Sequence, residues 1–423
     1  MMTFDPPELK EQIADAIRAI EKVIGHADYL GDDLINPADP EFDPSEHDDL
    51  VITPDYEWDL WLPDTYESIT MTYGSLLGLA EELKGAELIG GVEGWTPRRL
   101  LVRVYPMFGG ESYTTLEAWL DNAGPEGTLV QQVRANGVDL TCSFHRGNTL
   151  FGLMVVAFGY YDKHFPPTTA DEFFVEVLAE GLTDRSLMRA AADAYIFELA
   201  ASLRLDCRRS PRLDSDDLFP EDEPPLDTST PPTLRPLLLG PGLDAVIAIY
   251  NTAVAAQDPS FEILGFVKVI EHISQTVIRL QMTDAVRGKL ASPRALNPDA
   301  AFVLELENLV AEQRAMRKDR EALRATVQTC CEVTELKKDA PPFLVRLRSL
   351  DSADEKQRRA GLDELAGVLT ATRNSIAHAK AGYITTGEEC PPDQLGLLAS
   401  CARLAAEQAI RWYAARHESS RVI

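Results

Sequence analysis

A run of acids and prolines near the middle of the chain separates two parts with different folding patterns. Residues 214–225 read DSDDLFPEDEPP, and a stretch rich in Pro and Thr follows them. Prolines interrupt both helix and strand, and neighbouring carboxylates repel each other, so this segment cannot bury a core. We therefore predict an acidic, Pro-rich linker over 208–237, between domains at 1–207 and 238–423.

The two parts also differ in charge. Residues 238–423 contain 23 Lys and Arg against 24 Asp and Glu, whereas residues 1–237 contain 17 against 44. Nucleic acids are bound mainly through Lys and Arg, so the acidic part is a poor binder of a phosphate backbone. The balanced part can still hold a local positive cleft. Any phosphate site is therefore expected in the C-terminal part.

Targeting signals and metal motifs are not evident. Residues 1–6 lack the basic start and apolar core of a signal peptide, and the longest strongly apolar run, 150–161, is too short to cross a bilayer. Six cysteines are scattered without a Cys-x-x-Cys pair, which argues against a disulfide framework and a zinc site. We expect a cytoplasmic protein with no membrane segment, no metal and no cofactor.

The hydrophobic period changes along the N-terminal part and predicts an α+β domain with a small antiparallel sheet. Val, Leu and Phe dominate the strand candidates, which are separated by Gly-containing turns. The predicted strands are 100–104, 128–133, 138–144 and 150–158, and the predicted helices are 7–25, 65–84, 169–181 and 184–205. A regulatory or sensor role is the interpretation for this domain.

The C-terminal part has a helical period throughout and predicts an all-α bundle. Its predicted helices are 243–256, 261–281, 299–331, 342–350, 361–375 and 393–416.

Arg373, Asn374 and His378 lie within six residues at the end of one of these helices. An arginine carries a permanent charge that suits a phosphate, and a histidine moves protons near neutral pH. Five positions on an ideal helix are about 140° apart, so Arg373 and His378 converge only if the helix bends or ends near Ser375.

These residues and their helical context resemble the HEPN family, a helical module of many ribonucleases in bacterial defence, toxin–antitoxin and CRISPR-associated systems. The characteristic motif of the family is an Arg and a later His with four to six residues between them, often with a polar residue directly after the Arg. Arg373, Asn374 and His378 match that pattern. The further points of resemblance are Tyr250 in the first helix, Asp258-Pro259, Val269-Ile270-Glu271-His272 in the second helix, the long charged helix before the motif and an amphipathic helix after it.

The resemblance implies a metal-independent endoribonuclease in which the ribose 2′-hydroxyl attacks the adjacent phosphate. His378 would act as general acid or base, Arg373 would stabilise charge on the phosphate oxygens, and Asn374 would hold the site in place. Paired domains in the family imply a homodimer through the helical part. Antiviral defence or toxin-type growth arrest is the implied setting, with RNA as substrate and a protein or nucleic-acid trigger at the N-terminal domain.

Glu271 lies at the edge of the apolar face of the predicted helix over 261–281. An ion pair with Arg373 would hold the guanidinium in place, although an ordinary surface glutamate fits the pattern equally well. Arg411 and His417 also satisfy the bare spacing. We interpret that pair as chance, because its positions fall well apart around a continuous helix.

Three other interpretations remain open. Arg373 and His378 also fit a helix terminus without chemistry, where cations are stabilising in any protein. The helical part is also compatible with a non-catalytic HEPN-like module for dimerisation or interaction. The whole chain is also compatible with a regulatory partner of another nuclease, in which the acidic part blocks an RNA site by mimicry.

Overall fold

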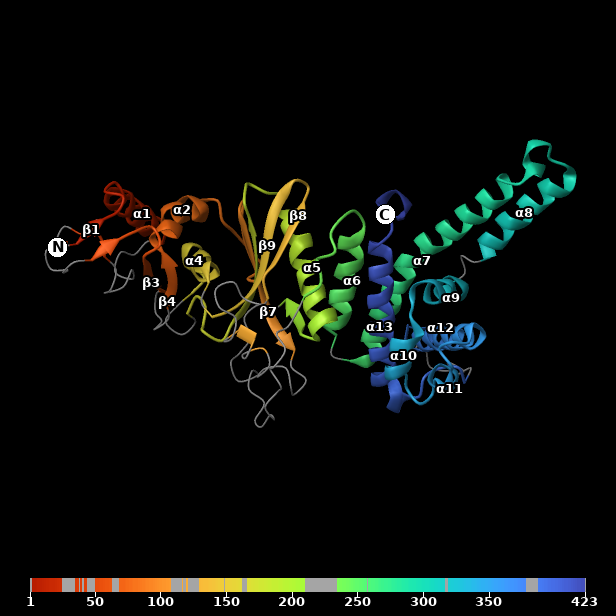
Figure 1. Ribbon diagram of the computed structural model, residues 1–423. Helices are drawn as coiled ribbons and strands as arrows, with labels where there is room; N and C mark the ends of the chain where they lie inside the picture. The colour runs from red at the N-terminus through yellow and green to blue at the C-terminus, as the bar shows by residue number, and fades with distance from the viewer. Residues whose placement is uncertain are drawn as a thin grey trace. The chain divides into compact units, whose positions relative to one another are not determined.

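The computed structural model divides into two compact units, Met1–Leu237 and Leu238–Ile423 (Figure 1). The described residues are 2–24, 35–37, 39, 42–43, 50–62, 68–107, 116, 119–120, 129–147, 149–161, 166–209, 234–256, 258–315, 319–377 and 387–422. The acidic run 214–225 and His378 lie outside them.

The N-terminal unit combines helices with an antiparallel sheet, as the sequence predicts. Within the described residues the strands are hydrogen-bonded in the order β5-β6-β7-β10-β9-β8, and β11 pairs with β7. Strand β11 extends the sheet two residues beyond 207. The strands are β5 (Glu87–Ile89), β6 (Glu93–Thr96), β7 (Arg99–Met107), β8 (Gln131–Ala135), β9 (Val138–Arg146), β10 (Phe173–Ala179) and β11 (Asp206–Arg209).

Helices cover both faces of this sheet (Figure 1). Helix α5 (Arg185–Leu203) packs against β7, β9 and β10, whose buried Val102 and Val175 face it. Helices α1 (Leu9–Ile24), α2 (Tyr73–Lys84) and α4 (Leu150–Ala157) share a second core with Leu101 and Phe174 on the other face. Alternate residues of one strand therefore enter different cores, because side chains of a strand alternate between its faces.

Two small sheets complete the core on the α1 side. Strands β1 (Thr3–Phe4) and β2 (Val51–Ile52) pair in parallel, and β3 (Glu57–Trp61) and β4 (Ser68–Thr72) pair antiparallel. Buried Trp58 in β3 stacks with Tyr73 at the start of α2, with a centroid distance of 5.8 Å.

The predicted strand over 150–158 is wrong, because this segment forms helix α4. A short apolar run contains no polar positions that would distinguish a helical period from a strand period. The Thr149 side chain caps the helix by accepting a hydrogen bond from the Phe151 amide at 3.3 Å. All residues from Phe151 to Val156 are buried, which explains why no polar residue interrupts the run.

The predicted helix over 169–181 is also wrong, because its centre forms strand β10. The strand reads FFVEVLA, which is rich in aromatic and β-branched residues that favour strands. It lies between β7 and β9. Phe173, Val175, Val177 and Ala179 are buried on one face, and the other face also carries apolar Phe174 and Leu178, so the sequence does not show the alternation of a half-exposed strand. The predicted helix over 65–84 begins only at Tyr73, after strand β4, where the Thr72 hydroxyl caps α2.

The C-terminal unit consists of helices only over the described residues from 243 to 414, as predicted. The α-helices are α6 (Leu243–Val254), α7 (Pro259–Leu290), α8 (Ala300–Ala315), α9 (Asp319–Cys330), α10 (Val333–Asp339), α11 (Val345–Ser349), α12 (Glu355–Ala377) and α13 (Leu395–Ala414). Short 3-10 helices are η2 (Pro293–Leu296), η3 (Pro392–Gln394) and η4 (Glu418–Ser420).

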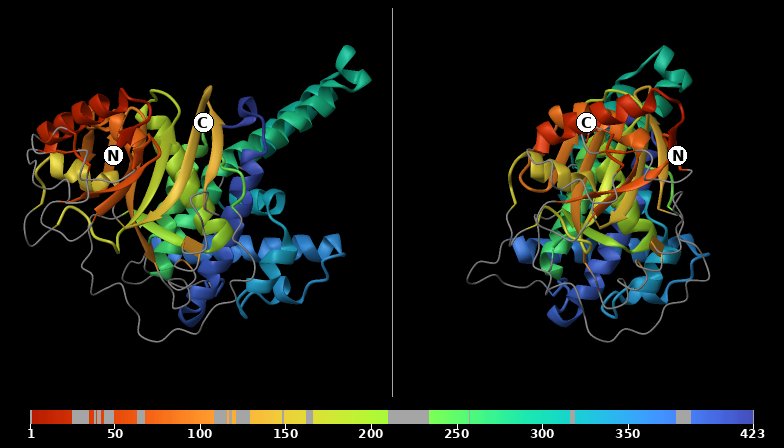
Figure 2. Two further views of the ribbon diagram at one scale, coloured as in Figure 1. Left: turned by 60° about the vertical axis from the view of Figure 1, so that its left-hand side comes forward. Right: turned by 90° about the vertical axis from the view of Figure 1, so that its left-hand side faces the viewer.

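Helix α7 is the centre of this unit and packs against α6, α9, α12 and α13. A Cβ at Gly265 would lie 2.4 Å from the Ala253 Cβ, so glycine allows α6 and α7 to approach closely. The second half of α7 and α8 project away from the other helices of the unit (Figures 1 and 2). The prediction of a single helix over 299–331 is wrong, because this segment forms two helices, α8 and α9. Helix α8 packs along α7, whereas α9 packs against both α7 and α12.

Candidate functional site

Arg373 and Asn374 lie near the C-terminal end of α12, where that helix packs against α7 and α9. The Arg373 side chain is 22% exposed. Its Nη1 donates a hydrogen bond to the Asn374 Oδ1 at 2.8 Å. Asn374 therefore holds one branch of the guanidinium.

Glu271 forms an ion pair with Arg373, which is one of the two interpretations that the sequence left open. It comes from the middle of α7, is 30% exposed, and accepts a hydrogen bond from the Arg373 Nη2 through its Oε1. This contact joins α7 to α12 across the bundle. The guanidinium is thus fixed from two sides, by a residue on its own helix and by a residue on the neighbouring helix.

Asp319 is the site residue that the sequence did not reveal. It begins α9, and its Oδ2 lies 3.7 Å from the Arg373 Nη2, with a side chain that is 73% exposed. An exposed contact of this length contributes little stability in water. No local sequence signal connects position 319 with position 373, because only the packing of α9 against α12 brings them together.

The charges around Arg373 are unequal, with one guanidinium facing two carboxylates. Burial raises the pKa of the Glu271 carboxyl, Arg373 opposes that rise, and the nearby charge of Asp319 adds to it. An arginine has five N–H donors, and Glu271 and Asn374 accept from two of them. Donors therefore remain for a phosphate, although the carboxylates reduce the positive potential that it would meet.

His378 directly follows the last residue of α12, Ala377, and lies outside the described residues. The helix is continuous through Ser375 and ends at Ala377. Any convergence of His378 with Arg373 therefore depends on the chain after Ala377, and it stays a prediction.

The second Arg–His pair of the sequence is separated by a helix end. Arg411 belongs to the last turn of α13, whereas His417 follows that helix and is exposed. The His417 ring accepts a hydrogen bond from the Ser419 amide at 3.3 Å and thereby caps η4. His417 has a local structural role at this position.

Tyr250, which contributes to the family resemblance, lies in a buried polar network of the same unit. Its hydroxyl donates to the Glu407 Oε1 at 2.7 Å, and the Arg403 Nε lies 3.2 Å from both of these atoms. A buried carboxylate needs such partners, because an uncompensated charge in a core is costly. This network ties α6 to α13.

A groove of about 740 Å³ runs along α9 and α12. Arg320, Arg324 and Arg346 line it, but acids offset two of these charges. The Arg324 Nε donates to Asp363 at 2.7 Å, and Arg320 lies 3.3 Å from Glu388. Since Arg320 directly follows Asp319, the groove and the Arg373 site share the start of α9.

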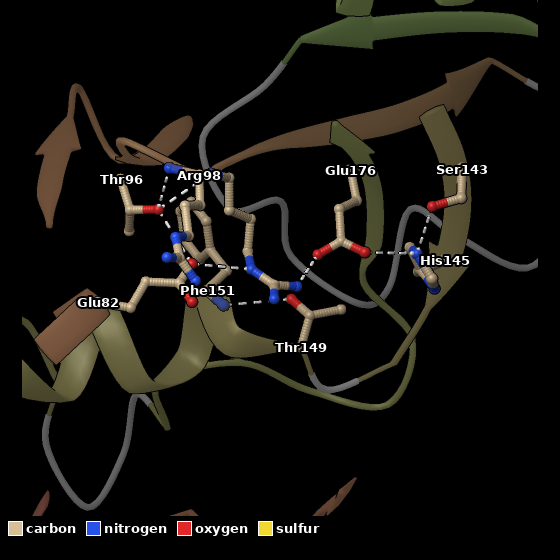
Figure 3. A network of polar contacts seen from close by, with 9 residues as sticks. Glu82, Thr96, Arg98, Ser143, His145, Thr149, Phe151 and Glu176 are labelled. Carbon is tan, nitrogen blue, oxygen red and sulfur yellow. Dashed lines mark hydrogen bonds and ion pairs between the residues drawn. The ribbon is translucent and has the colours of Figure 1, made fainter. Parts of the chain in front are cut away.

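A second polar cluster lies on the sheet of the N-terminal unit (Figure 3). Arg99 on β7 forms ion pairs with Glu82 of α2, at 3.0 Å, and with Glu176 of β10. The His145 Nε2 lies 3.2 Å from the Glu176 Oε2 and 2.8 Å from the Ser143 Oγ. A hydrolase triad uses both ring nitrogens, whereas both partners share one nitrogen here, so this cluster does not have that geometry.

Acid is expected to destabilise the N-terminal unit through Glu176. Burial raises the pKa of this carboxyl, but the hydrogen bond from His145 and the charge of Arg99 outweigh that effect and lower it from 4.5 to about 2. A depressed carboxyl pKa contributes stability above the unfolded value that is lost as the pH falls. We expect a loss of about 3 kcal/mol in the free energy of unfolding between about pH 4.5 and pH 2.

Denaturant unfolding of the wild type and of Glu176→Gln, followed by circular dichroism from pH 5 to pH 2, measures this contribution. The Gln variant is expected to lack that part of the acid dependence. Glu57→Gln, at an exposed position of β3, is the control and should behave as the wild type. Equal acid dependence in all three proteins would contradict the assignment to Glu176.

Comparison with family models, curated proteins and solved structures finds no match to this chain. The resemblance to HEPN domains therefore rests on the motif and its helical context. Within the described residues, no helix combines the length and apolar content needed to cross a bilayer. Those same residues contain no group of three His, Cys, Asp or Glu side chains placed to share a metal ion.

Proposed function

We propose that the C-terminal unit is a HEPN-like, metal-independent endoribonuclease with Arg373, Asn374 and His378 at its active site. The observation that carries the proposal is the fixed position of Arg373, which Glu271 and Asn374 hold at a partly exposed helix end. A guanidinium preorganised in this way can stabilise a developing phosphate charge without reorganising during the reaction.

The chemistry begins when the ribose 2′-hydroxyl attacks the adjacent phosphorus and expels the 5′-oxygen of the next nucleotide. His378 takes the hydroxyl proton as a general base or supplies a proton to the leaving oxygen as a general acid, and water exchanges the other proton. Arg373 binds the phosphate oxygens as their negative charge grows. Glu271 and Asn374 position Arg373. The products are a 2′,3′-cyclic phosphate and a 5′-hydroxyl.

The wider setting follows from the resemblance. A homodimer through the helical unit would place two copies of the motif at one cleft. The acidic N-terminal unit would serve as a sensor or regulatory domain for a protein or nucleic-acid trigger. A cytoplasmic role in antiviral defence or toxin-type growth arrest is part of the same proposal, which rests on family analogy.

Product analysis tests the proposal. A labelled single-stranded RNA and a DNA of the same sequence are incubated with the full chain in EDTA. We expect cleavage of the RNA to a cyclic phosphate and no cleavage of the DNA, because DNA lacks the attacking hydroxyl. Cleavage of the DNA as well as the RNA, or cleavage of neither nucleic acid, would contradict the proposal.

A non-catalytic interaction module is the second candidate, and the carboxylates at Arg373 favour it. Glu271 and Asp319 together outweigh the charge of one arginine. The variant Asp319→Asn separates the two candidates. It removes a competitor for phosphate and should raise RNA affinity in a nuclease, whereas an interaction module should show no RNA binding before or after the change.

A further inference from the structure

A cavity of about 510 Å³ lies in the N-terminal unit, between the turn that joins β5 to β6 and helix α4. Its walls include the side chains of Leu88, Phe151, Val155 and Pro167. Cavities of about 300–1,000 Å³ with mostly apolar walls are typical small-molecule sites. The cavity is separate from the Arg373 site, which belongs to the other unit.

Arg103 is the charged residue of this wall. It is only 8% exposed, its Nη2 lies 2.9 Å from the Glu172 Oε2, and its Nη1 donates to the Gly91 carbonyl at 3.3 Å. Its guanidinium carbon lies 4.7 Å from the centroid of the Phe151 ring. The pair with Glu172 is electrically neutral overall, so Arg103 can donate to a neutral ligand without attracting a polyanion.

An aromatic pair lies beside the cavity. Tyr160, which lines it, is 69% exposed, and its ring stacks on that of Phe158 with a centroid distance of 6.3 Å and an interplanar angle of 7°. At Gly90 and Gly91 an added Cβ would meet nothing within 4 Å, so the backbone itself forms this part of the wall and no side chain covers it. Both glycines have positive φ, which the tight β5–β6 turn requires.

We propose that this cavity binds a planar heteroaromatic molecule of nucleobase or nucleoside size. Such rings stack on exposed tyrosines, and their edges carry both hydrogen-bond donors and acceptors. Arg103, which lines the cavity, donates to the acceptors of the edge. The charge of residues 1–237, with 17 basic against 44 acidic side chains, disfavours polyphosphates, so the ligand is recognised through its ring.

This site makes the N-terminal unit a receptor for a small molecule. The proposal does not depend on RNA cleavage by the other unit, because its readout is ligand binding alone.

Isothermal titration calorimetry of the full chain with adenosine, guanosine, cytidine and uridine tests the proposal. At least one nucleoside is expected to bind, and its triphosphate is expected to bind more weakly. Absence of heat with all four at millimolar concentration would overturn the proposal, as would tighter binding of the triphosphate.

Two variants locate the binding. Leu88→Trp places a large ring in the cavity and should abolish binding, whereas Leu182→Trp, at an exposed position of the same unit, should leave it unchanged. Tyr160→Ala changes an exposed residue, so folding is preserved, and should weaken binding by about tenfold through lost stacking. Unchanged affinity in both Leu88→Trp and Tyr160→Ala would overturn the assignment to this cavity.

Discussion

Substituting Arg373 with alanine is expected to lower the single-turnover rate of RNA cleavage by about 10²- to 10³-fold, the loss typical of removing one donor that stabilises an oxyanion. The guanidinium lies at a partly exposed helix end with donors left over from Glu271 and Asn374. Its removal leaves the growing charge on the phosphate without its strongest partner. RNA binding should weaken less than the chemical step, because other contacts hold the strand.

Arg373→Lys separates charge from geometry. A lysine keeps the positive charge but cannot bind Glu271, Asn374 and a phosphate through a planar fork, so an intermediate rate is expected. Arg279→Ala, at an exposed position of α7, is the matched control and should cleave as the wild type. Thermal unfolding of each variant checks that the bundle is intact. A wild-type rate for folded Arg373→Ala would remove Arg373 from the active site.

His378→Ala is expected to reduce cleavage by about 10²- to 10⁴-fold, the range for a general acid or base. The dependence of the cleavage rate on pH should also flatten near neutral pH, because the group that titrates there is gone. His417→Ala provides the control, since His417 belongs to the other Arg–His pair and caps η4. An equal loss of rate in both variants would indicate a general effect on folding rather than catalysis by His378.

The helical fold of the C-terminal unit was predictable because several of its segments show an amphipathic helical pattern over many residues. The segments at α4 and β10 were not, since short, mostly apolar runs show no clear period and their type depends on neighbours distant in sequence. The same dependence limits the site. The place of Glu271 at the edge of an apolar helix face made it a candidate partner of Arg373 but fitted a surface glutamate equally well, whereas Asp319 required the packing of α9 against α12.

The cavity and the polar cluster of the N-terminal unit lacked any sequence signal. Arg99 and Arg103 lie four positions apart in β7 with only apolar residues between them, and nothing in that sequence links either arginine to an acid. Only the register of β7 against β10 places Glu176 beside Arg99, and only the position of α4 brings Phe151 under Arg103. Both arrangements join elements that are separated by dozens of residues.

Cleavage of a DNA strand that contains a single ribonucleotide tests the assignment of Arg373 and His378 most directly. In EDTA, the wild-type chain should cut this strand once, directly after the ribonucleotide, and leave a 2′,3′-cyclic phosphate, while Arg373→Ala and His378→Ala cut it at least about 10²-fold more slowly. Cutting at other positions, no cutting by the wild type, or undiminished cutting by either variant would contradict a reaction that needs one 2′-hydroxyl, one guanidinium and one imidazole.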